Sequence, residues 1–187
     1  QEAEGFLKKR GAGISIKEDP AKEDLLKFAE LRQAVSKARQ APMLAKRSLD
    51  PEAVSFSNLP ELSAITSRGP MTPDHIIRTK RTPLVLRQDA NRDVEIYSKE
   101  YAAYFNRHTD GKLKCLDSAP RWAVWPGFGT VAFGQTTEEV EIVSDITGHT
   151  IQAIQMGETL GGWKPISEKE FFEVEYWVLE QAKLKKG

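Results

Sequence analysis

The sequence predicts an α/β domain in three layers, α/β/α, with a central mixed or antiparallel sheet and extra helices at the N-terminus. Three observations support this fold class. Short β-branched segments occupy the middle of the chain, helical patterns lie on both sides of them, and 187 residues are enough for one domain with a substantial core. We expect residues 1–57 to form a helical N-terminal segment and residues 58–187 to form the α/β domain.

The N-terminal segment carries two helical patterns. Residues 1–9 place Ala3, Phe6 and Leu7 on one side of a short helix. Asp19-Pro20 then begins a second helix with a wide apolar face, which ends before Pro42. Residues 37–47 form a basic segment, which is interpreted mainly as a solvated face, with anion binding as the alternative; its basic residues are Lys37, Arg39, Lys46 and Arg47.

The middle of the chain alternates between helical and extended patterns. Apolar residues at helical spacing predict a short helix over 58–68, which stops at Gly69-Pro70. We expect four strands in one sheet, at 76–78, 84–86, 122–124 and 130–133, and a helix at 93–108. Pro126-Gly127 is the expected turn between the last two strands.

Two capping boxes organise the last third of the chain. Thr136 with Glu139 begins a long helix, and Ser167 with Glu170 begins another. The second helix carries apolar residues around nearly its whole circumference. A helix of that kind is covered on several sides, so we expect a second domain or subunit to pack against it.

Two segments resemble the metal-site region of the class II aldolase/adducin family. Residues 72–86, TPDHIIRTKRTPLVL, resemble the strand that ends in His-Thr-His, and residues 122–134, WAVWPGFGTVAFG, resemble the hairpin that holds Asn-His-Gly. Gly129 and Gly134 keep the spacing of that hairpin. At the three metal-ligand positions, however, this sequence has Arg78, Lys80 and Phe128.

Three further motifs resemble a region of sugar-phosphate aldolases that are fused to a short-chain dehydrogenase. These motifs are GPMTPDH at 69–75, PGFG at 126–129 and EYWVLEQAKL at 175–184. The resemblance implies an upstream aldolase core, a downstream dehydrogenase domain and a homo-oligomer. It also implies substrates such as rhamnulose or fuculose phosphate.

The replaced ligands change the expected chemistry of the site. Guanidinium and ammonium groups have no free lone pair, so they repel a cation and attract an anion. We therefore expect no metal and no cofactor, and an anion-binding role for Arg78 and Lys80, assisted by backbone N–H groups near Gly127 and Gly129. An internal salt bridge and a plain tight hairpin are the alternatives. His75 is the candidate general acid, unless it only forms local hydrogen bonds.

Composition excludes several classes of protein. The 27 basic and 27 acidic residues balance, so no net field favours nucleic acid or an anionic membrane. No apolar run approaches the ~20 residues that cross a bilayer. Cys115 is the only cysteine, which favours a cytoplasmic protein without disulfides.

Two functions fit these features. One is an accessory or degenerate class II aldolase-like domain that serves assembly and contacts a substrate phosphate. The other is an independent sugar-phosphate binding protein, or a lyase, in which Arg78 and Lys80 replace the positive charge of a metal.

Overall fold

The computed structural model describes residues 2–14, 16, 24–87 and 89–184 of the chain. Its centre is a four-stranded mixed sheet in the order β1-β4-β3-β2. The pairs β1–β4 and β3–β4 are antiparallel, whereas β2 and β3 run parallel. The strands are β1 (Leu44–Ser48), β2 (Leu84–Val85), β3 (Trp122–Trp125) and β4 (Gly129–Gly134).

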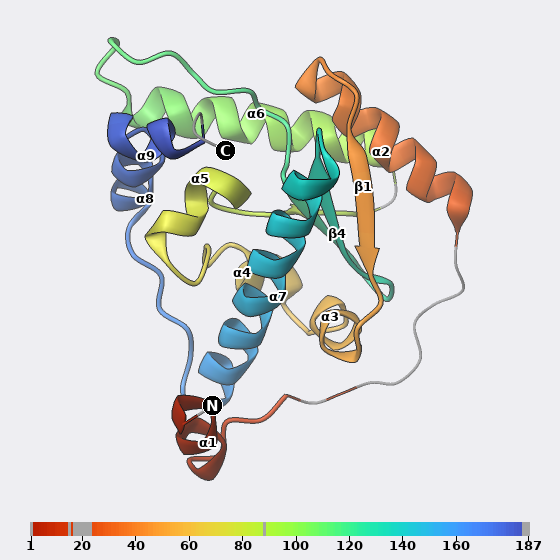
Figure 1. Cartoon of the computed structure of the whole chain (residues 1–187), viewed down its shortest axis with the longest axis vertical. Helices are drawn as coiled ribbons and strands as arrows, with labels where there is room; N and C mark the ends of the chain where they lie inside the picture. Colours follow the sequence, from red (N-terminus) through yellow and green to blue (C-terminus); the bar gives the residue numbers. More distant parts are fainter. Residues whose placement is uncertain (1, 15, 17–23, 88, 185–187) are drawn as a thin grey trace.

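Helices cover both faces of the sheet (Figure 1), which confirms the predicted α/β/α arrangement. One layer contains α2 and α6, and the other contains α3, α4 and α7. The helices are α1 (Glu2–Lys9), α2 (Leu25–Arg39), α3 (Pro51–Ser57), α4 (Leu62–Thr66), the 3-10 turn η1 (Pro73–His75), α5 (Ile76–Thr79), α6 (Ala90–His108), α7 (Thr137–Thr159), α8 (Glu168–Glu175) and α9 (Val178–Lys183).

Side-chain alternation along β3 divides the core between the two layers. Ala123 and Trp125 pack with α2 and α6, whereas Trp122 and Val124 pack with α3 and α7. Both strands of the β3–β4 hairpin are buried along their whole length. The hairpin therefore lies between the two halves of the core and contributes side chains to both.

The predicted helix starts are largely confirmed. The Thr136 hydroxyl accepts the Glu139 N–H at the start of α7, and Ser167 with Glu170 forms a complete capping box at the start of α8. Helix α6 and the β3–β4 hairpin also lie where the sequence predicts them. The expected start of a helix at Asp19-Pro20 lies outside the described residues. Of the helix expected over 58–68, the short α4 is present.

Two predictions of local structure are wrong. Residues 76–78, expected as a strand, form helix α5, because Pro73 occupies the first position of a helical turn after an extended Thr72. The expectation that residues 1–57 are helical is wrong at 44–48, which form strand β1. Strand β1 lies at one edge of the sheet and has no fully buried side chain, so it lacks the alternating apolar pattern that indicates a strand.

The predicted last helix is two helices with different surroundings. In α8, Phe171 and Phe172 are buried, and Phe172 joins an aromatic cluster with Tyr104, Phe105 and Tyr176. Helix α8 ends at Glu175, Trp177 has an extended backbone, and α9 begins at Val178. Three consecutive apolar side chains at this break, Trp177, Val178 and Leu179, are exposed.

Candidate anion-binding site

Helix α5 places Arg78 in a cavity of about 200 Å³ beside the end of β4 and the start of α7. Arg39 and Arg121 line the same cavity, and Ile77 and Val143 form part of its apolar wall. Arg39 comes from the end of α2, and Arg121 immediately precedes β3. Three guanidinium groups from separate parts of the chain therefore meet around one space.

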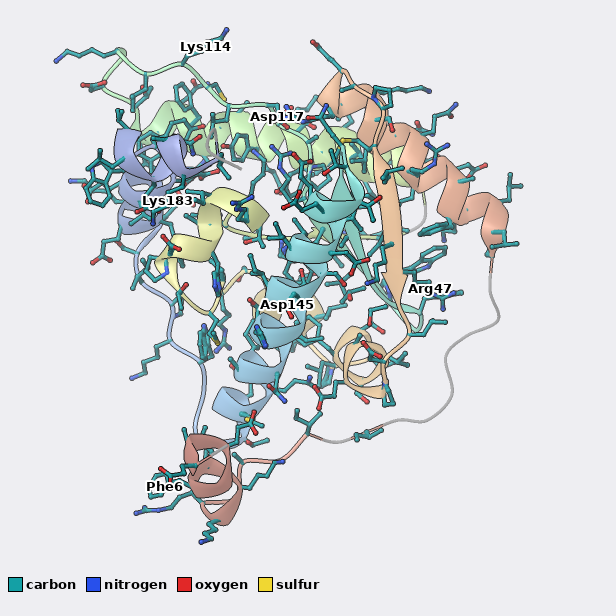
Figure 2. All side chains as sticks on the ribbon, viewed as in Figure 1. Phe6, Arg47, Lys114, Asp117, Asp145 and Lys183 are labelled. Atoms are coloured by element: carbon teal, nitrogen blue, oxygen red, sulfur yellow. The ribbon has the colours of Figure 1, made fainter. Side chains whose placement is uncertain are left out.

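Asp117 neutralises part of this positive charge. It lies in the loop between α6 and β3 (Figure 2) and forms ion pairs with Arg39 at 2.9 Å and with Arg121. Burial alone would raise the pKa of Asp117, but its hydrogen bond and ion pair with Arg121, with further help from Lys80 and Arg39, lower that pKa to about 2. Asp117 is consequently ionised throughout the physiological pH range.

Arg78 is the cation of the cavity that has no ion pair or hydrogen bond among the described residues. Glu139 is the one acidic residue in the wall, and its carboxylate accepts a hydrogen bond from the Gln135 N–H at 2.7 Å. Three arginines thus face two carboxylates, and one positive charge remains. The Arg78 guanidinium can therefore bind an anion through two parallel, charge-assisted hydrogen bonds, in a bidentate arrangement.

The structure separates Lys80 from Arg78. Lys80 follows the last turn of α5 with a φ of 60°, and only 3% of its surface is exposed. Its Nζ donates to the Asp117 carbonyl oxygen at 2.6 Å and lies 3.3 Å from the centre of the Tyr101 ring. Lys80 therefore lies inside the protein, and the Asp117 residue connects it to the arginine cavity.

A small polar cluster surrounds Lys80. The Tyr101 hydroxyl bonds to the Glu175 carboxylate at 2.8 Å and to the Tyr176 hydroxyl at 2.9 Å. Burial, together with the nearby charge of Arg121, lowers the pKa of Lys80 to about 7. Burial also raises the pKa of Glu175, although the charge of Lys80 opposes that change.

Gly127 and Gly129 do not join Arg78. They lie at the tip of the β3–β4 hairpin, whereas the arginine cavity adjoins the opposite end of β4, about 17 Å away along a six-residue strand. The Gly129 N–H already donates to the Ser57 hydroxyl at 3.1 Å. The plain tight hairpin is thus the better account of these glycines.

Phe128 lies at the third position where the class II aldolase/adducin family has a metal ligand. Its ring stacks on Trp125 with 4.5 Å between the ring centres, and its carbonyl oxygen accepts hydrogen bonds from Arg47. The family resemblance implies a divalent metal, but a packed ring, a buried ammonium group and a guanidinium group do not fit one. Among the described residues, no group of three or more His, Cys, Asp or Glu side chains is arranged to hold a metal ion.

His75 stands apart from the cavity. It ends the turn η1 and is half-buried, and its Nδ1 atom has no hydrogen-bond partner among the described residues. The neighbouring Asp74 forms an ion pair with Lys183. His75 does not line the cavity that contains Arg78. His75 therefore does not act together with Arg78 at this cavity.

Sequence reasoning missed Arg121 and Asp117. Arg121 directly precedes the apolar strand WAVW. A basic residue at the start of a buried strand was the sequence feature that could have indicated a functional role for Arg121. Arg39 was noted as one member of a basic segment. Its ion-pair partner Asp117 could not be identified because that residue comes from a loop far along the chain, between α6 and β3.

Comparison with known proteins identifies relatives. Residues 22–184 match the family described as "Aldolase class II, second domain". The curated "Uncharacterized oxidoreductase YuxG" of Bacillus subtilis (strain 168) is 30% identical over 166 residues, which cover 82% of this chain and 24% of that protein. The chain therefore spans about a quarter of the length of this relative.

One solved structure, "YgbL, a putative aldolase/epimerase/decarboxylase from Escherichia coli", aligns with a TM-score of 0.48 and 13% identity over 79% of this chain and 64% of that one. Among the described residues, no helix combines the length and apolar character needed to cross a membrane. Since the family match covers most of the sequence, this chain belongs to the class II aldolase family, as a second domain of that type.

Proposed function

We propose that this domain is an accessory part of a class II sugar-phosphate aldolase, holds no metal of its own and contacts the phosphate group of the substrate through Arg78. The observation that carries the proposal is the Arg78 cavity. Asp117 forms ion pairs with Arg39 and Arg121, whereas Arg78 has no ion pair or hydrogen bond among the described residues. A phosphate dianion is well matched to such a group of cations.

The wider setting belongs to the same proposal. The domain works beside an upstream aldolase core and a downstream short-chain dehydrogenase domain, within a homo-oligomer. A relative named as an oxidoreductase, of which this chain spans about a quarter, supports a longer assembly. Rhamnulose or fuculose phosphate are the proposed substrates, because the sequence motifs resemble aldolases of that kind.

An independent lyase that uses Arg78 and Lys80 in place of a metal is the weaker candidate. Such a mechanism requires both cations to touch one enolate. Lys80 is buried against Tyr101 and Asp117, whereas Arg78 lines a separate cavity. The separation of the two side chains therefore favours the accessory role.

Calorimetric titration with inorganic phosphate and with rhamnulose 1-phosphate tests the proposal. Arg78→Met should weaken both ligands at least ~10-fold, since a hydrogen bond to a charged group contributes about 1.5–3 kcal/mol. Lys80→Met should leave the affinity within about twofold, because Lys80 does not line the cavity. Lys37→Met, which removes an exposed cation from the same helix as Arg39, is the matched control. Equal phosphate affinity in wild type and Arg78→Met would contradict the assignment.

A further inference from the structure

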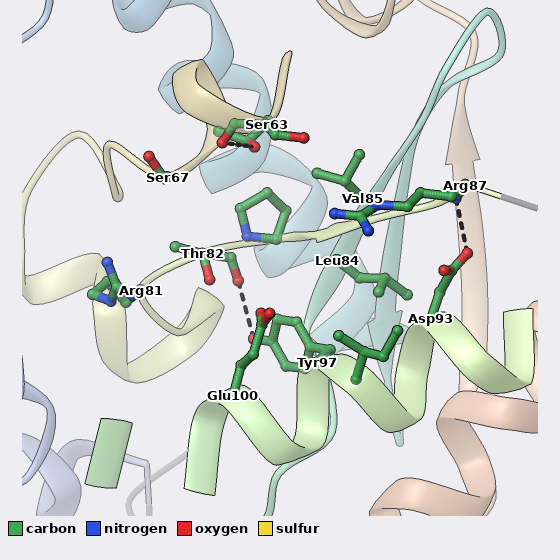
Figure 3. Close-up of a pocket in the computed structure, with 13 residues that line it drawn as sticks. Ser63, Ser67, Arg81, Thr82, Leu84, Val85, Arg87, Asp93, Tyr97 and Glu100 are labelled. Atoms are coloured by element: carbon green, nitrogen blue, oxygen red, sulfur yellow. Dashed lines mark hydrogen bonds between the residues drawn. The ribbon is translucent and has the colours of Figure 1, made fainter. Parts of the chain in front are cut away.

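A second cavity lies at the open edge of the sheet, where β2 has a partner on one side only. Its volume is about 200 Å³, and its walls come from α4, from residues 81–87 and from α6 (Figure 3). A smaller chamber lined by Tyr97, Tyr101 and Tyr104 adjoins it and shares Arg81, Thr82 and Glu100. Neither space shares a lining residue with the Arg78 cavity.

Internal hydrogen bonds fix the walls of this cavity. Tyr97 donates to the Thr82 carbonyl oxygen at 3.0 Å, and the Arg87 N–H donates to Asp93 at 2.8 Å (Figure 3). Both bonds tie the segment before and after β2 to helix α6. The backbone on both sides of β2 is therefore held in place against α6.

Four polar side chains of this cavity have no partner among the described residues. They are the hydroxyls of Ser63 and Thr82, the guanidinium of Arg87 and the carboxylate of Glu100. Arg81 differs from them, because it forms an ion pair with Glu168 at 3.3 Å and lies over the Tyr104 ring. The carboxylate of Asp93 also lines the cavity, where it accepts the Arg87 N–H and has no ion pair among the described residues. One unpaired cation, two carboxylates and two hydroxyls thus remain.

The backbone of β2 and a buried tyrosine add two further groups. The Leu86 N–H bonds to Val124 of β3, so in this parallel pair Val85 directs its own N–H and C=O away from β3 and toward the cavity. In the adjoining chamber, Tyr104 is almost fully buried, and its hydroxyl lies beside Glu175 without forming a well-aligned hydrogen bond. A buried hydroxyl of that kind is costly unless a water or a ligand satisfies it.

We propose that this edge cavity binds a small hydroxycarboxylate of three or four carbons. Arg87 holds the carboxylate, because a guanidinium matches that group with two parallel hydrogen bonds. Glu100, Ser63, Thr82 and the backbone of Val85 bind the hydroxyl groups. The apolar parts of Pro83, Leu84 and Ile96 lie against the carbon chain.

Volume and charge select this class of ligand. A space of about 200 Å³ has room for a ligand of the size of a three- or four-carbon acid. The lining of the edge cavity contains two arginines and two carboxylates, whereas the lining of the Arg78 cavity contains three arginines and one carboxylate. The cavity thus favours a singly charged ligand, in contrast to the Arg78 cavity.

Nuclear magnetic resonance titration of the full chain tests this inference. Glycerate should shift the amide signals of Thr82, Val85 and Glu100 in a saturable way, with at least ~5-fold higher affinity than propionate, which lacks hydroxyls, or glycerol, which lacks charge. Inorganic phosphate should shift residues around Arg78 and leave the Val85 amide unchanged. This difference separates a failure here from a failure of the proposed phosphate site.

Two variants and a control sharpen the test. Arg87→Met should weaken glycerate at least ~10-fold, whereas Arg92→Met, an exposed cation outside the cavity, should not. Glu100→Leu should weaken glycerate yet leave propionate unchanged or slightly tighter, because the substitution removes both the acceptor of the ligand hydroxyl and a charge that repels the ligand carboxylate. The inference is overturned by the absence of saturable shifts at these amides up to about 50 mM glycerate, or by equal glycerate affinity in wild type and Arg87→Met.

Discussion

Lys80 is a buried cation whose charge responds to pH near neutrality. Burial and the charge of Arg121 lower its pKa from 10.5 to about 7. Between these two pH values the unfolded chain binds more protons than the folded chain, so this group makes the folded state more stable as the pH rises. From pH 7 to pH 9 the gain in the free energy of unfolding should be about 2 kcal/mol.

Urea denaturation at both pH values measures this gain. Lys80→Met should abolish most of the increase, because Met cannot release a proton, and Lys114→Met, an exposed cation in the neighbouring loop, should retain it. The same pH dependence in wild type and Lys80→Met would show that the ammonium group does not titrate in this window.

Gly129 lies where strand β4 passes close to the end of strand β1. Its φ is 110°, and a Cβ atom added there would overlap the carbonyl oxygen of Ser48 in β1. Gly129→Ala should therefore lower the free energy of unfolding by roughly 2–4 kcal/mol. Gly148→Ala is the control, because this exposed helical glycine of α7 has open space around it and should gain about 0.5–1 kcal/mol. Thermal unfolding followed by circular dichroism compares the two variants.

At the scale of an element, α8 depends on its capping box. Ser167 accepts the Glu170 N–H, and the Glu170 carboxylate accepts the Ser167 N–H. Ser167→Ala should cost about 1 kcal/mol of stability. Lys169→Ala, an exposed position of the same helix, should stay within about 0.5 kcal/mol of wild type. Chemical denaturation distinguishes these outcomes, and a loss of equal size in both variants would argue against the cap.

The elements that sequence patterns predicted well are those with long periodic segments or caps. Helix α6 and the β3–β4 hairpin each contain one continuous series of buried residues, so the local spacing of apolar residues was sufficient to predict them. Residues 76–78 were predicted as a strand because Ile76 and Ile77 are β-branched residues that favour strands. In the structure Ile76 is buried on the short helix α5. Strand β1 could not be found because its pairing with β4 is non-local.

The candidate site shows the same limit. Arg78 was identified from its place in a motif, and the structure puts it beside a cavity. The prediction that Arg78 and Lys80 act together assumed that residues two apart on a strand face the same side. In the structure Arg78 lies on helix α5 and Lys80 directly follows it, so Arg78 lines the cavity whereas Lys80 is bonded to Asp117 inside the protein. Arg39 and Arg121 reach the cavity through tertiary folding, which residue spacing does not encode.

At the scale of the whole molecule, the break between α8 and α9 leaves an apolar surface. We define the C-terminal ridge as Trp177, Val178 and Leu179, which are 53%, 73% and 63% exposed. Exposed apolar neighbours of this kind are typical of contact surfaces. The expected second domain or subunit that covers this part of the chain remains a prediction, for which the ridge is the natural contact.

Sedimentation of the purified chain tests that prediction. Wild type should associate as concentration rises, and the double variant Trp177→Ser with Val178→Ser should shift the association at least ~10-fold toward monomer through lost apolar burial. Leu25→Ser with Leu26→Ser, which changes another exposed apolar pair, is the matched control. A wild-type chain that stays monomeric at all concentrations would confine the ridge to contacts with other domains.

The register of β1 against β4 also has a consequence during synthesis. Ser48 pairs with Thr130, and roughly 80 residues separate them. At about 5–20 residues per second, a ribosome adds that length in roughly 4 to 16 seconds, during which β1 has no partner strand. A nascent chain is therefore exposed to wrong strand pairing until the hairpin emerges, and the charged Lys46 and Arg47 on β1 are the kind of residues that discourage such pairing.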